Sequence, residues 1–219
     1  MRGVFVTGTD TGVGKSVVAA SVCAALAARG ERVAAFKPVV TGLDDEPGEF
    51  GHDHELLASA ANAGQAPEDV APYRFGPPVS PHHAAELAGA PIEPAQLLAV
   101  ARAHALLVAE GVGGLLVPIT TGYLVRDLAI DLELPVVVAA RTGLGTINHT
   151  LLTVEAARTA GLHVAGVVMT PWPDEPLAIE RSNRETIERL SGVRVSGLPA
   201  TNRDGLAEVA ASLPLEAWL

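Results

Sequence analysis

Short apolar runs alternate with amphipathic stretches from one end of the chain to the other. Runs such as 135–140 are apolar at every position, which is typical of strands buried on both faces of a parallel sheet. The apolar runs predict strands at residues 3–8, 33–39, 105–110, 115–119, 135–140, 164–169 and 194–198.

The segments between these runs have the apolar spacing of helices. They predict helices at residues 15–29, 53–62, 81–88, 94–104, 124–132, 146–160, 177–191 and 204–212. Strand–helix–strand alternation implies right-handed crossovers, and therefore an α/β fold with a doubly wound, mostly parallel sheet and helices on both faces. Segments 40–52 and 64–80, rich in Gly, acidic residues or Pro, are expected to be loops. No linker divides the chain, so we expect residues 1–219 to form a single domain.

Composition narrows the class of protein. The net charge of −10 and an aromatic content of 4% disfavour nucleic-acid partners and anionic membranes. No apolar run reaches the ~18 residues of a spanning helix, and the N-terminus enters a strand pattern directly, so we expect no signal peptide. The one cysteine, Cys23, lies among Ala and Val and is expected to be a core residue. These features predict a soluble cytoplasmic protein.

The chain has two lysines against thirteen arginines. Lys15 closes a glycine-rich stretch and Lys37 ends the apolar run 33–36. Lysine is a compact point charge that can approach a phosphate closely, whereas arginine is a planar fork. Both lysines stand where an α/β nucleotide-binding fold would hold its phosphates.

The sequence from Gly8 to Ser16 predicts a phosphate loop, because it joins the first predicted strand to the first predicted helix. In such a loop Lys15 contacts the β- and γ-phosphates and the Ser16 hydroxyl binds Mg²⁺. Five residues, rather than the usual four, separate Gly8 from Gly14. A dinucleotide-binding fingerprint is excluded because its third glycine would stand at Val17. The nucleotide-binding residues expected in this loop are Thr11, Gly12, Val13, Gly14, Lys15 and Ser16.

Two acids are candidates for binding the metal. Glu110 ends a predicted strand, where phosphate-loop enzymes place an acid for Mg²⁺. Asp53 opens the predicted helix 53–62 and is either a ligand or a first-turn acid favoured by the helix dipole. A transition-metal site at His52, Asp53 and His54 is disfavoured, because adjacent helical residues point to different faces; we expect these histidines to be solvated.

Three segments, in this order and at these separations, resemble the dethiobiotin synthetase family: GTDTGVGKS at 8–16, KPVVTG at 37–42 and EGVGG at 110–114. Weaker similarity extends over PYRF at 72–75, SPH at 80–82 and LGTINH at 144–149. The resemblance covers essentially the whole chain and implies a P-loop NTPase-like fold.

This resemblance implies an ATP- and Mg²⁺-dependent ligase that joins CO2 to 7,8-diaminononanoate and closes a ureido ring, releasing ADP and phosphate. The attacking carbamate and the γ-phosphate are both anionic, so the reaction needs several cations. Lys15 and Lys37 would be the catalytic residues beside the γ-phosphate. Ser16, Asp53 and Glu110 would hold Mg²⁺.

The resemblance also implies contacts to the substrate and the base. Thr11 and Thr41 would contact the carbamate or a substrate amine. The substrate tail would cross a homodimer interface, with its carboxylate at the helix N-terminus formed by Gly145, Thr146 and Asn148. The remaining nucleotide contacts would be Asp53, Glu110, Gly111, Val112, Gly113, Thr170, Pro171, Gly197, Leu198 and Pro199.

Three positions depart from the family pattern. Gly12 replaces a frequent Glu, which removes one substrate contact, and Val112 replaces Ala, which narrows the pocket. Thr170 replaces an Asn that reads adenine, and a hydroxyl cannot pair bidentately with a base edge. We therefore expect loose base selectivity, with other triphosphates as possible co-substrates.

Other classes with this fold remain as alternatives. A partition or cell-division type switch ATPase would carry a second lysine at the position of Asp10 and would have a basic surface or a membrane-binding tail, whereas residues 213–219 are short and acidic. An amidotransferase-linked ligase domain or a small nucleotide kinase is the other alternative. A kinase needs an arginine-rich lid, but loop 40–52 is acidic and loop 64–80 contains only Arg74.

Overall fold

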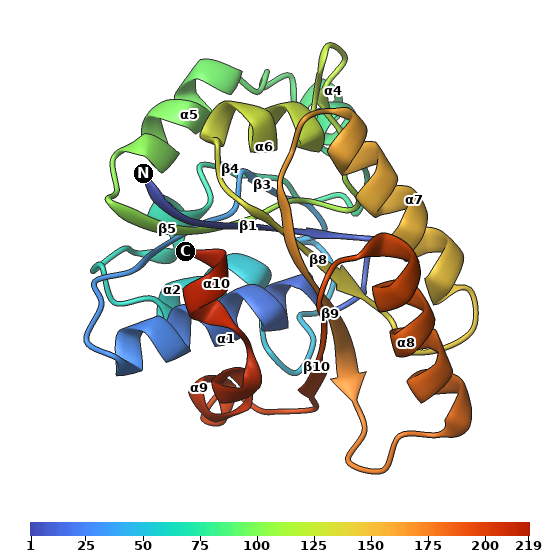
Figure 1. Cartoon of the computed structure of the whole chain (residues 1–219). Coiled ribbons are helices and arrows are strands. Elements are labelled where there is room, and N and C mark those ends of the chain that lie inside the picture. Colours follow the sequence, from blue (N-terminus) through green and yellow to red (C-terminus); the bar gives the residue numbers. More distant parts are fainter.

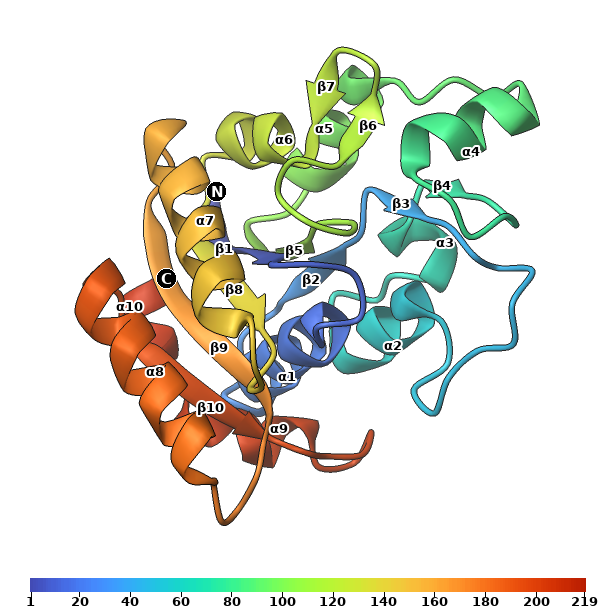
Figure 2. The ribbon, with the colours of Figure 1, turned by 90° about the vertical axis from the view of Figure 1, so that its right-hand side faces the viewer.

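Six parallel strands form one sheet through the middle of the protein, in the order β10-β9-β8-β1-β5-β2 (Figures 1 and 2). The computed structural model describes all residues 1–219. The sheet strands are β1 (Arg2–Gly8), β2 (Ala34–Phe36), β5 (Leu106–Glu110), β8 (Val136–Ala140), β9 (Val164–Trp172) and β10 (Val195–Pro199). The predicted α/β fold with a parallel sheet is confirmed.

Helices cover both faces of this sheet (Figures 1 and 2). One face carries α1 (Lys15–Ala28), α2 (Asp53–Ala60), α9 (Leu206–Val209) and α10 (Leu215–Trp218). The other carries α5 (Pro94–Arg102), α6 (Val125–Leu132), α7 (Thr146–Thr159) and α8 (Ala178–Ser191). Helix α4 (Pro81–Ala88) contributes to the same core but lies beyond the β2 edge of the sheet (Figure 2).

Side chains of the strands alternate between two hydrophobic cores. Phe5 of β1 packs in the core under α5 to α8, whereas Val4 and Val6 pack in the core under α1 and α2. Every residue of β5 and β8 is buried. This double burial explains why these strands are apolar at nearly every position. Cys23 is fully buried in the second core, as expected.

Two predicted strands were wrong in part. Residues 115–119 do not join the parallel sheet; β6 (Pro118–Thr120) pairs antiparallel with β7 (Tyr123–Leu124) in a separate hairpin. Pro118 has no N–H to donate, which disfavours a central strand. The predicted strand 33–39 ends at Phe36, and β3 (Val39–Val40) pairs instead with β4 (Tyr73–Arg74) outside the main sheet.

Segment 64–80 is not wholly a loop, because it contains α3 (Pro67–Val70) as well as β4. The predicted helix 204–212 divides into α9 and the 3-10 turn η1 (Ala210–Ser212). No helix in the structure has the length and apolar character needed to cross a bilayer. The cytoplasmic location stays a prediction.

Strand register brings the chemically important segments to one edge of the sheet. Phe36 of β2 lies beside Ala109 of β5, and Val6 of β1 lies beside Glu110. Lys37 follows Phe36 directly, so it emerges next to Glu110 at the carboxyl ends of these strands. Parallel α/β sheets bind their ligands at this edge.

Candidate active site

The loop between β1 and α1 needs glycine at two positions. A Cβ atom on Gly14, whose φ is 87°, would lie 2.5 Å from Cγ2 of Thr170. A Cβ atom on Gly8 would lie 2.8 Å from Cγ2 of Val13. The loop therefore passes closer to its neighbours than any residue with a side chain would allow.

Helix α1 presents a free N-terminus to this loop. No side chain caps the helix, and its first turn contains no acid. The Nζ atom of Lys15 donates to the main-chain oxygen of Asp10 at 2.8 Å. Arg141, which follows β8, donates to the main-chain oxygen of Thr11 at 3.1 Å and pairs with the Asp10 carboxylate at 3.3 Å. Uncapped amides, the helix dipole and the Lys15 ammonium together favour an anion here.

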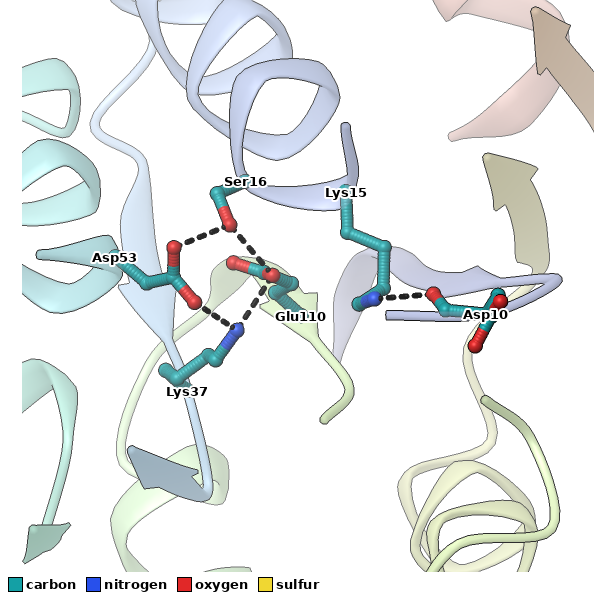
Figure 3. A network of polar contacts seen from close by, with 6 residues as sticks. All are labelled: Asp10, Lys15, Ser16, Lys37, Asp53 and Glu110. Atoms are coloured by element: carbon teal, nitrogen blue, oxygen red, sulfur yellow. Dashed lines mark hydrogen bonds and ion pairs between the residues drawn. The ribbon is translucent and has the colours of Figure 1, made fainter. Parts of the chain in front are cut away.

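Four side chains form a closed ring of polar contacts beside the loop (Figure 3). The Ser16 hydroxyl lies 2.7 Å from Oδ1 of Asp53 and 2.9 Å from Oε1 of Glu110. The Lys37 ammonium donates to Oδ2 of Asp53 at 2.7 Å and to Oε1 of Glu110 at 2.5 Å. The ring joins residues that come from α1, from α2 and from the ends of β2 and β5.

Burial and mutual charge set the ionisation of these groups. Burial raises the pKa of Glu110; the Lys37 charge opposes this effect, and the nearby Asp53 charge adds to it. Burial acts in the same direction on Asp53, but Lys37 and the Ser16 hydrogen bond outweigh it and lower the pKa of Asp53 to about 2. Burial opposes the charge on Lys37, yet the two carboxylates raise its pKa. Burial, followed by repulsion from Lys37, lowers the pKa of Lys15 to about 8.

These groups line a single cavity of about 660 Å³. The residues that were predicted from the sequence and that line this cavity are Thr11, Gly12, Gly14, Lys15, Ser16, Lys37, Thr41, Asp53, Glu110, Val112 and Gly113. The two lysines, which stand 22 positions apart in the sequence, therefore face one common space. Among the side chains of the ring, one buried atom forms no hydrogen bond: Oε2 of Glu110.

The structure places other predicted residues outside this cavity. The Val13 side chain is 2% exposed in the core under α1, and Gly111 lies against Phe5 and Val125. Thr170 is buried against Gly14. It belongs to β9, which lies on the opposite side of β1 from β2, the strand that leads to Lys37. Pro171 follows it, and Gly197, Leu198 and Pro199 lie on the neighbouring strand β10.

The predicted tail site lies at the start of α7. Gly145 has a φ of 90°, no side chain caps the helix, and the first turn lacks acids, as in α1. Asn148 is exposed, whereas the Thr146 hydroxyl donates to the main-chain oxygen of Arg141 at 2.6 Å. None of these residues lines the cavity.

The expectation of two solvated histidines at 52 and 54 was wrong for His54. His54 is 6% exposed, and burial lowers its pKa. The protein contains no group of three or more His, Cys, Asp or Glu residues arranged to hold a metal. The oxygens of Ser16, Asp53 and Glu110 are the donors that could bind a hard cation beside a phosphate.

Sequence reasoning missed several residues of the site. Arg141 anchors the phosphate loop, and its position directly after an apolar strand was an available signal. Asp45, Phe50 and Val79 also line the cavity. They come from loops whose sequence shows turns but does not show what the turns face.

The sheet, the glycine loop leading into α1, and the Lys15–Ser16 pair beside a strand-end acid define a P-loop nucleotide-binding fold. Solved structures agree. A ParA family ATPase from Chlorobium tepidum superposes with a TM-score of 0.55 at 11% identity, covering 96% of this chain and 89% of that one. The septum site-determining protein MinD of Pyrococcus horikoshii, complexed with Mg-ADP, gives 0.54 at 16% identity, covering 97% and 89%. At these identities the similarity shows the fold alone.

Sequence comparisons show the family. A family model described as an AAA domain matches residues 2–202. The chain is 49% identical to the ATP-dependent dethiobiotin synthetase of Anaeromyxobacter dehalogenans (87% of this chain, 86% of the relative). It is 37% identical to the enzyme of the same name from Bacillus subtilis (90% and 87%). The chain belongs to the dethiobiotin synthetase family and is a ligase that forms C–N bonds.

Proposed function

We propose that this enzyme uses ATP to join CO2 to 7,8-diaminononanoate and to close the ring of dethiobiotin, giving ADP and phosphate. The observation that carries the proposal is that Lys15 and Lys37 line the same cavity as Ser16, Asp53 and Glu110. A partition-type switch has only a shared fold in its favour.

The triphosphate would lie along the start of α1. The uncapped amides of the helix and the Lys15 ammonium bind the β- and γ-phosphates. Thr170 lies against Gly14 of the loop. In the strand order, β9 and β10 lie on the opposite side of β1 from β2, which leads to Lys37. The base would therefore lie near Thr170, Pro171 and residues 197–199, with the γ-phosphate toward Lys37.

Ring closure would proceed in three steps, in which Lys37 offsets negative charge. One substrate amine adds to CO2 and releases a proton, forming a carbamate. A carbamate oxygen then attacks the γ-phosphorus, which forms a mixed carbamic–phosphoric anhydride and releases ADP. The second amine attacks the carbonyl carbon, closes the ring and expels phosphate. Lys37 exchanges its carboxylate contacts for the oxygens of the carbamate and γ-phosphate, and Thr41 holds the carbamate or an amine.

The donor set fits Mg²⁺. One hydroxyl and two carboxylates, with Oε2 of Glu110 buried and unpartnered, suit an ion that takes few protein ligands and completes its shell with phosphate oxygens and water. When bound there by Ser16, Asp53 and Glu110, the ion would neutralise phosphate charge.

The substrate carboxylate would bind at the N-terminus of α7, formed by Gly145, Thr146 and Asn148. Free amides without a competing acid support this assignment. We also propose a homodimer in which the substrate tail lies at the subunit interface. Leu144, which is 94% exposed beside this helix start, is a candidate contact across that interface.

Phosphate release from several nucleoside triphosphates tests the function directly. We expect release that requires both 7,8-diaminononanoate and bicarbonate, with cytidine, guanosine or uridine triphosphates accepted beside ATP. Omitting the diamine or the bicarbonate provides the control. Release from no triphosphate, or release that ignores the diamine, would contradict the proposal.

A further inference from the structure

The cavity contains one carboxylate that the proposed reaction does not use. Asp53 and Glu110 are both committed to Ser16 and Lys37. Asp45 is the only other acid among the lining residues. Its carboxylate forms no ion pair with another side chain.

The loop that carries Asp45 is held in place. The main-chain N–H groups of Gly42, Leu43 and Asp44 donate to the oxygens of Pro77, Phe75 and Gly76 at 3.0–3.2 Å. The N–H of Asp45 then donates to Gly42 at 3.2 Å and closes a turn. The Asp45 carboxylate is thus presented from a fixed backbone, with Oδ2 3.7 Å from the Cβ position of Gly42.

The free carboxylate of Asp45 favours a cationic group of the substrate as its ligand. A vicinal diamine carries at least one ammonium near neutral pH. Asp53 and Glu110 are already paired with Lys37, whereas Asp45 offers an unpaired anion on the loop that also carries Thr41. Pro78 and Val79 line the cavity nearby and provide an apolar surface for the methylene chain.

We propose that Asp45 binds the substrate ammonium and selects a diamine for this site, an inference that rests on the proposed function. One amine lies at Thr41 and Lys37 as the carbamate. The other is held at Asp45 as an ammonium and releases a proton to solvent at this exposed residue before its nitrogen attacks the carbonyl carbon.

Adjacent acids provide a matched pair of variants. The carboxylate of Asp44 points to Gly76, 2.4 Å from the Cβ position of that glycine, and does not line the cavity. Phosphate release is measured for Asp45→Asn and Asp44→Asn at varied 7,8-diaminononanoate, with ATP and bicarbonate saturating. We expect Asp45→Asn to raise the diamine KM about tenfold or more, as for loss of a charged hydrogen bond. The ATP KM of Asp45→Asn and the diamine KM of Asp44→Asn should match the wild type.

A second measurement separates binding from folding. Calorimetry of the diamine added to protein loaded with a non-hydrolysable ATP analogue should show the same loss for Asp45→Asn and partial recovery for Asp45→Glu. An unchanged diamine KM in Asp45→Asn, or an equal rise in Asp44→Asn, would overturn this inference. Wild-type protein without diamine-dependent phosphate release would overturn the proposed function instead.

Discussion

The Nζ atom of Lys37 lies 2.5 Å from Oε1 of Glu110, and both side chains are almost fully buried. The two residues are 73 positions apart and meet because β2 and β5 are neighbours in register. The buried Lys37 ammonium and Glu110 carboxylate compensate each other's charge, and Oε2 of Glu110 has no hydrogen-bond partner. An anionic ligand would compete for Lys37, and a cation would compete for Glu110.

Replacing Lys37 with arginine should separate nucleotide binding from chemistry. Lys37→Arg keeps the positive charge, but the planar guanidinium cannot approach the carbamate and γ-phosphate as closely. We expect ATP affinity close to that of the wild type and diamine-dependent turnover lower by about a hundredfold or more. Equilibrium binding of an ATP analogue and steady-state phosphate release provide the two values. Turnover at the wild-type level would remove Lys37 from its assigned role.

Glu110→Gln tests the proposed metal ligand. The amide keeps the shape of the side chain but loses the anionic oxygens, so Mg²⁺ should no longer strengthen binding of a non-hydrolysable ATP analogue. We expect a loss of about tenfold or more in the affinity measured with Mg²⁺, and little change without it. Glu55→Gln is the control, because Glu55 lies in the same acidic helix start as Asp53 but outside the cavity. Equal effects in both variants would argue against a role for Glu110.

Lys15 should make triphosphate binding depend on pH. Its pKa is lowered to about 8 in the free protein, so it is protonated below that pH and increasingly neutral above it. A bound triphosphate favours the charged form. Binding should therefore take up a proton above pH 8, and affinity should fall as pH rises further.

Calorimetry in two buffers of different ionisation enthalpy measures this uptake. Because the Lys37 charge contributes to the lowered pKa, Lys37→Met should shift the inflection to higher pH. Affinity that stays constant from pH 7 to pH 9.5 would contradict this assignment.

Gly14→Ala should disrupt the phosphate loop. The added methyl group would lie 2.5 Å from Cγ2 of Thr170, and the alanine would have to adopt a φ of 87°. We expect destabilisation of about 2 kcal/mol and strongly weakened nucleotide binding, measured by denaturant unfolding and fluorescence titration. Adding Thr170→Ser removes the clashing methyl and should restore part of the stability. Gly12→Ala is the control, because its φ is also positive but no atom lies within 4 Å of the added carbon. Equal losses at both glycines would rule out the contact with Thr170 as the cause.

Local pattern was sufficient to predict most of the fold. Continuous apolar runs such as 135–140 marked β8, and the phosphate loop was visible because strand, glycines, Lys15 and Ser16 follow one another in the chain. Sequence spacing does not show which strands are neighbours. The contact between Lys37 and Glu110 depends on that order. Family resemblance therefore predicted the roles of these two residues, but the sequence did not predict that they touch.

Short elements were predicted less well for a different reason. The hairpin of β6 and β7 and the pairing of β3 with β4 involve two or three residues each, too few for a period to appear. Asp45 and Arg141 were missed because their surroundings come from segments distant in the sequence.

A structure determined with Mg²⁺, a non-hydrolysable ATP analogue, 7,8-diaminononanoate and bicarbonate would show whether both ammonium groups bind the reacting oxygens. The measurement is the distance from each lysine Nζ to the nearest γ-phosphate or carbamate oxygen. We predict that Lys15 and Lys37 both lie within hydrogen-bonding distance of this one anionic group. A complex in which either ammonium points away, with Lys37 still held by Asp53 and Glu110, would contradict the proposed roles of the two lysines.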